Sequence, residues 1–94
     1  MDVVVIKTVG GEEVIAGVVS NTPDSFKVSK PRLVIKTETP NGIGISLVPW
    51  LMAAPDFDVE IANSIMAVVP APSDIASRYL ELVSGIVMPS GKLQ

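Results

Sequence analysis

The residues from Val3 to Val19 constrain the fold more than any other part of this 94-residue chain. Their sequence, VVVIKTVGGEEVIAGVV, places two β-branched apolar runs on either side of Gly10 and Gly11. Glycine tolerates the positive φ of tight hairpin turns, whereas valine and isoleucine favour extended backbone. The pattern therefore predicts a β-hairpin. Because residues 3–6 are all apolar, we expect the first strand to be central in its sheet and covered on both faces.

Further turn signals and apolar alternation predict a β meander. Gly17 interrupts the second run, which predicts a bend or bulge there. Pro31 cannot donate a ladder hydrogen bond, so we expect it to break its strand or to lie at an exposed edge. Turn residues occur at 21–24, 39–42 and 63–64, and apolar alternation predicts strands at 25–29, 33–35, 43–48, 57–61 and 65–69.

Beyond Pro72 the apolar period changes to that of a helix. Ser73 is the predicted N-cap, and Gly85 can end the helix. One stripe carries Ile75, Tyr79, Leu82, Val83 and Ile86. We therefore predict one all-β domain over residues 1–94. Its strands form a small, strongly bent, five-stranded barrel over about residues 3–70, followed by a C-terminal α-helix over about residues 73–86.

Composition narrows the classes of function. The chain has no cysteine and no histidine, which removes the commonest nucleophile partners and metal ligands. We expect no enzyme activity, no cofactor and no metal site. The net charge of −3 argues against DNA binding, although Lys27, Lys30, Arg32 and Lys36 form a local basic stretch. That stretch could follow a phosphate backbone or could simply keep a strand edge soluble.

The apolar content also bears on assembly and location. Hydrophobic residues make up 48% of this small chain, so we expect other copies of the chain to cover part of its surface. No apolar run reaches the ~18 residues of a membrane-spanning helix. The N-terminus lacks the basic region of a signal peptide. We therefore expect no membrane association and a cytoplasmic location.

Two segments resemble the Sm-like (LSm) family, and most closely its small phage-type chains. The segment KTVGGEEVIAGVV (Lys7 to Val19) is similar to the family's first motif, in which a strand turns through glycine into a bent second strand. The segment VEIANSIMAVVP (Val59 to Pro70) lies where the family has an Ile-Arg-Gly turn. If the chain is of phage origin, the cytoplasm is that of the host cell.

The resemblance implies a bent five-stranded barrel that forms a ring of five to seven copies, with a pentamer or hexamer favoured. It also implies binding of single-stranded RNA, or an RNA-chaperone role, through polar residues of two loops. Ala62 replaces the family's arginine, so we expect a weakened RNA site. The candidate RNA-binding residues are Asn21, Asp24, Lys27, Lys30, Arg32 and Asn63.

Candidate interface residues follow from the same resemblance and from the apolar loop VPWLMAAP. The strand residues are Ile61, Ile65, Met66 and Val68, and the loop contributes Trp50 and Leu51. That loop could contact a partner or pack within its own ring. Two alternatives to RNA binding stay open: a structural or protein-interaction ring without RNA, and an SH3-like barrel that binds peptides.

Overall fold

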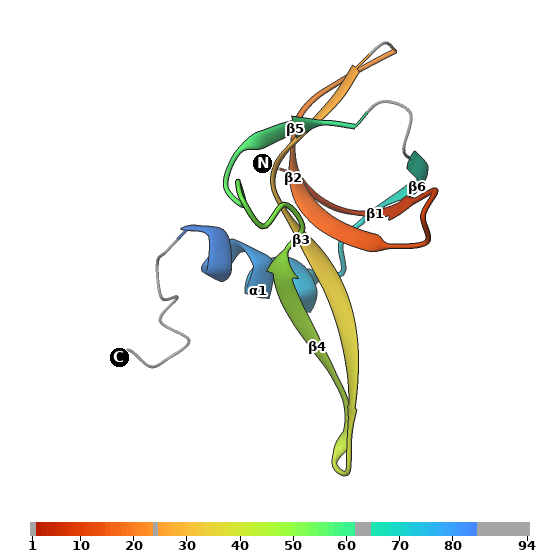
Figure 1. Ribbon diagram of the computed structural model, residues 1–94, viewed down its shortest axis with the longest axis vertical. Helices are drawn as coiled ribbons and strands as arrows, with labels where there is room; N and C mark the ends of the chain where they lie inside the picture. The colour runs from red at the N-terminus through yellow and green to blue at the C-terminus, as the bar shows by residue number, and fades with distance from the viewer. Residues whose placement is uncertain (1, 24, 62–64, 85–94) are drawn as a thin grey trace.

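The computed structural model describes residues 2–23, 25–61 and 65–84. Six strands and a helix follow one another along the chain (Figure 1). They are β1 (Val3–Thr8), β2 (Glu13–Thr22), β3 (Ser25–Thr39), β4 (Gly42–Pro49), β5 (Asp58–Glu60), β6 (Ile65–Pro70) and α1 (Ser73–Ser84). The strands form one antiparallel sheet with the order β4-β3-β2-β1-β6, and β5 pairs with β3 outside this path. This confirms the prediction of a mostly β chain with a C-terminal helix.

The N-terminal hairpin is confirmed. Val3 pairs with Gly17, and the ladder continues to the pair of Lys7 and Glu13. Gly11 has a φ of 91°, and its N–H donates to the carbonyl of Thr8 at 3.0 Å. The other edge of β1 pairs with β6, so β1 is a central strand, as its uninterrupted apolar run predicts.

Pro31 does not break its strand. It is buried, and β3 continues through it, so the prediction of a break or an exposed edge was wrong. Ile15 pairs with Arg32 while Gly17 pairs with Ser29, so two residues of β3 face one residue of β2 in a bulge. A bulged residue leaves the ladder, so proline's missing N–H costs no ladder hydrogen bond there.

An irregular segment separates β4 from β5. Residues 50–57 turn twice, with hydrogen bonds from Ala54 N to Leu51 O (3.2 Å) and from Phe57 N to Ala54 O (3.4 Å). The strand resumes only at Asp58. Phe57 was predicted to share the half-buried alternation of the residues after it, but it is 69% exposed because it lies before the strand.

The core lies inside the curved sheet. A cluster of buried side chains joins β1, β2 and β3 to the residue that follows β5, and consists of Ile6, Ala16, Phe26, Val28 and Ile61. Trp50 packs against this cluster from the loop. Val14 and Ile15 are both fully buried although neighbouring strand residues face opposite sides. Both faces of β2 are therefore covered, and α1 contacts this strand.

The second half of β3 and all of β4 form a two-stranded arm that projects from the curved body (Figure 1). The chain measures 43 × 29 × 26 Å along its principal axes. At the tip, Thr39 pairs with Gly42 across a two-residue loop, and Gly42 has a φ of 129°. The threonine hydroxyl donates to the carbonyl of Gly42 at 2.8 Å.

Helix α1 docks through a narrower stripe than its sequence predicts. Tyr79 is its one buried residue among those described, and Leu82 is 48% exposed instead of docked. Ala76 N donates to the carbonyl of Pro72 at 2.8 Å, which puts Pro72 rather than Ser73 at the N-cap position. The predicted helix end at residue 86 lies outside the described residues.

Candidate functional site

The basic stretch of β3 does not form one patch. Lys27 is exposed and is paired in register with Glu60 of β5. Lys30 has a φ of 51° and donates from Nζ to the carbonyl of Val83 in α1 at 3.2 Å. Lys36 is exposed on the arm. The bulge and the length of β3 therefore direct these cations to different parts of the surface.

The side chain of Arg32 is bound by acceptors within its own chain. Its side chain is 7% exposed and lies 2.8 Å from Asp56 Oδ1 through Nη2. Its Nη1 donates to the carbonyls of Pro55 at 2.6 Å and Pro31 at 3.2 Å. A buried guanidinium needs such acceptors, because an unpaired charge in the interior is costly. Arg32 thus anchors residues 55–56 to β3 and presents little of its charge to an external phosphate.

The predicted RNA loops are only partly described. Asn21 is exposed near the end of β2, where it pairs with Phe26. Asp24 and Asn63 lie outside the described residues. Phe26 itself is 7% exposed and belongs to the core. Of the described candidates, Lys27 lies one register position from Asn21 on the paired strand β3.

The apolar loop has an inner and an outer part. Trp50 is half-buried, and its Nε1 donates to Glu12 Oε1 at 3.2 Å, which joins the loop to the first hairpin. Leu51 is 37% exposed and Met52 is 79% exposed. Trp50 thus packs against the core and the first hairpin of its own chain, while the next two side chains are more exposed.

The candidate interface residues of the strands also include buried and exposed side chains. Ile61 belongs to the core, where its side chain packs within its own chain. Its N–H donates to the carbonyl of Phe26 at 2.9 Å. Val68 and its neighbour Val69 in β6 are exposed. Ile65 and Met66 lie in the same strand. Strand β6 is one end of the sheet order and β4 is the other.

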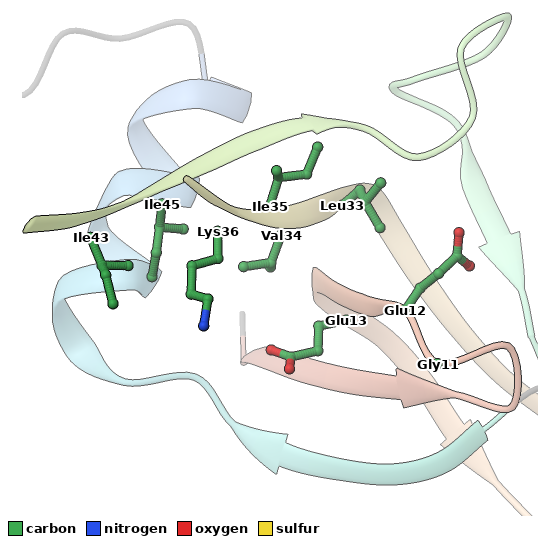
Figure 2. Close-up of a pocket in the computed structure, with 9 residues that line it drawn as sticks. All are labelled: Gly11, Glu12, Glu13, Leu33, Val34, Ile35, Lys36, Ile43 and Ile45. Atoms are coloured by element: carbon green, nitrogen blue, oxygen red, sulfur yellow. The ribbon is translucent and has the colours of Figure 1, made fainter. Parts of the chain in front are cut away.

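An open cavity of about 460 Å³ lies between the arm and the first hairpin (Figure 2). Val34, Ile43, Ile45 and Lys36 point from the arm toward Glu13 of the hairpin. The walls are therefore mainly apolar on the arm side and carboxylate-bearing on the hairpin side. This concave surface was not anticipated from the sequence, because its two sides come from segments about 20 to 30 residues apart.

The hydrogen bonds of the Tyr79 hydroxyl are the second feature that sequence reasoning missed. Its hydroxyl accepts a hydrogen bond from Gly17 N at 3.0 Å and donates toward Ser29 O at 2.7 Å. The carbonyl of Lys30 lies 3.1 Å from the same hydroxyl. Burial raises the pKa of Tyr79 above its ordinary value of 10.0, although the bond from Gly17 and the charge of Arg32 act in the opposite direction. The only sequence signal was a single tyrosine in the helical stripe.

A scan against models of known protein families found no match to this sequence, and a comparison with curated proteins found none either. Over the described residues, no helix has the length and apolar character needed to cross a membrane. Within the same residues, histidine, cysteine and carboxylate side chains form no group of three or more that could hold a metal ion.

Proposed function

We propose that this chain is a non-catalytic assembly module: an Sm-like β-barrel domain that forms a homo-oligomeric ring of five to seven copies. In this ring β4 of one copy pairs with β6 of the next. One observation carries the proposal. The two strands at the ends of the sheet order, β4 and β6, both present exposed apolar side chains. Unpaired strand edges and exposed apolar residues are hazards that pairing between copies removes together.

The register identifies which backbone groups β4 offers. Thr39 of β3 and Gly42 of β4 flank a two-residue loop, so these two residues form a hydrogen-bonded pair. Eight residues after Gly42, Trp50 N likewise donates to β3, at Pro31 O with a distance of 3.4 Å, so every second residue from Gly42 bonds to β3. Alternation then directs the peptide groups of Ile43, Ile45 and Leu47 away from β3. These groups are the ones that an added strand would meet.

Side-chain exposure supports the same two edges. On β4, Ile43 is 65% exposed; on β6, Val68 is 41% exposed and Val69 is 51% exposed. A two-stranded arm has little stability of its own in water, so contact with a neighbouring copy would also stabilise it. The closure into a ring rests on the resemblance to Sm-like chains, whereas the choice of β4 and β6 as the paired strands rests on their places at the two ends of the sheet order.

The assembly can be tested by blocking the edge of β4. Ile43→Pro removes an outward N–H without removing a hydrogen bond to β3, and Ile43→Val is the matched control that keeps this N–H. Light scattering over a concentration series should give a mass of five to seven times 9.9 kDa for the parent and for the valine variant. The proline variant should assemble only at higher concentration. A parent that stays monomeric would contradict the ring and favour the SH3-like peptide-binding reading.

RNA binding is the second candidate function. The exposure of Lys27 and Lys36 supports it, whereas the buried Arg32 and the net charge of −3 weigh against it. The test is fluorescence anisotropy with short uridine and adenine oligomers at about 50 mM salt. Replacing both lysines by serine should weaken binding and flatten its salt dependence, because fewer counterions are released. No binding up to ~100 μM protein, a concentration at which even non-specific binders respond, would leave the ring without RNA.

A further inference from the structure

Arg78 of α1 contacts the edge of β4. Its Nη2 donates to the carbonyl of Ile45 at 2.5 Å. The two residues are 33 positions apart, so this contact depends on the docking of the helix. Both α1 and β4 are shown in Figure 1, where the helix crosses beside the root of the arm. A helix side chain therefore occupies part of a strand edge.

Ile45 is the middle of the three β4 residues whose peptide groups point away from β3. Ile43 and Leu47 are its outward neighbours at the two-residue spacing of a strand. A strand added to this edge would need the Ile45 carbonyl as an acceptor. While the guanidinium holds that carbonyl, an incoming N–H must displace it.

The helix that carries Arg78 is fixed at two other points. Tyr79, the next residue, is 1% exposed and bonded to the backbone of β2 and β3. One helical turn later, the carbonyl of Val83 accepts a hydrogen bond from Lys30 at 3.2 Å. Arg78 itself is exposed, so its side chain can swing away without disturbing these anchors.

We infer that Arg78 is a gate on the β4 edge: its side chain competes with the β6 strand of a second copy for the carbonyl of Ile45. This inference rests on the proposed assembly through β4. The gate holds the edge closed in the isolated chain and opens when a correctly placed strand supplies its own donor. It restricts pairing to partners that can replace a charge-assisted hydrogen bond.

The test compares the concentration of half-assembly for three variants by light scattering. Arg78→Ala removes the competitor, and we expect half-assembly at a concentration about three- to tenfold lower, the effect of one exposed hydrogen bond. Arg78→Lys keeps the charge but has a single donor group, so it should lie between the alanine variant and the parent. Lys27→Ala makes the same charge change on the part of β3 that pairs with β5, and it should match the parent.

The outcomes separate the gate from the assembly itself. If the parent assembles and Ile43→Pro weakens it, but Arg78→Ala behaves like Lys27→Ala or assembles less well, the gate is rejected and the β4 interface stands. If neither the parent nor Arg78→Ala assembles, the proposed function fails as well. If both Arg78 variants fail to fold, Arg78 is a structural residue of the helix contact, and the gate is again rejected.

Discussion

The hydroxyl oxygen of Tyr79 lies 3.0 Å from the backbone nitrogen of Gly17, although the two residues are 62 positions apart. The same hydroxyl donates toward the carbonyl of Ser29, which is paired in register with Gly17. The phenol therefore bridges β2 and β3 beside the bulge, where the ladder shifts its register. It satisfies backbone groups at a buried position, where an unpaired group would be costly.

Removing only this hydroxyl should destabilise the chain. Tyr79→Phe leaves a buried N–H without its partner, and we expect the free energy of unfolding to fall by about 1–3 kcal/mol. Urea denaturation measures the change. Ser77→Ala, on the exposed face of the same helix, should change stability by less than about 0.5 kcal/mol. Equal stability of the parent and the phenylalanine variant would mean that water replaces the hydroxyl.

The same group should make stability depend on pH in the alkaline range. Because burial raises the pKa of Tyr79 above 10.0, the unfolded chain loses this proton before the folded chain does. The stability that Tyr79 contributes is therefore fully present below about pH 10 and is lost as the pH rises through the pKa of Tyr79 in the folded chain. Tyr79→Phe should lack this part of the decrease. The chain has one tyrosine, so ultraviolet absorbance of tyrosinate reports this group alone, and an unshifted titration would contradict the prediction.

Arg32 should control the order of the loop over residues 50–57. Arg32→Met keeps most of the aliphatic volume but removes the bonds to Pro55 and Asp56, so the loop amides should exchange with solvent faster and the loop should become sensitive to proteases. Lys36→Met makes the same charge change on the same strand at an exposed position and should leave the loop unchanged. Equal exchange rates in the two variants would show that the contacts of Trp50 and the hydrogen bond from Lys30 N to Phe57 O are enough to anchor the loop.

Gly17 should tolerate a side chain poorly. It is buried beside the bulge, with its N–H on Tyr79, so Gly17→Ala should reduce stability by about 1–3 kcal/mol through overpacking or displacement of the phenol. Gly44→Ala is the control, because a Cβ there would meet only the Thr37 carbonyl at an ordinary 3.9 Å. Thermal unfolding of the two variants gives the comparison. Similar melting temperatures of the two variants would show that the fold tolerates a side chain at Gly17.

The elements that the sequence predicts well are those whose causes are local. The first hairpin depends on Gly11 and on two adjacent β-branched runs, and it forms as expected. The arm likewise depends on a turn sequence and the strands beside it. Helix α1 begins after Pro72 because the prolines end β6 and the apolar period changes there. In each case the deciding residues lie within a few positions of one another.

The features that could not be predicted depend on partners far along the chain. Lys27, Lys30, Arg32 and Lys36 look like one basic stretch, but alternation, the bulge and the length of β3 separate them. The partners of Arg32 lie 23 and 24 positions away, and nothing in the sequence marks Pro55 and Asp56 as those partners. The burial of Pro31 depends in the same way on a register shift between two strands.

The pairing of β1 with β6 and the hydrogen bonds of Tyr79 to β2 and β3 have a consequence for the order of folding. Strands β1 to β4 are consecutive hairpins, so they can form as the chain leaves the ribosome. The second partner of β1 and the phenol that completes the bulge come from residues about 60 positions later. During synthesis one edge of β1 therefore stays unpaired until β6 has been made. Chaperone binding or misfolding of the nascent chain is most favoured in that interval, before residues 65–84 have emerged.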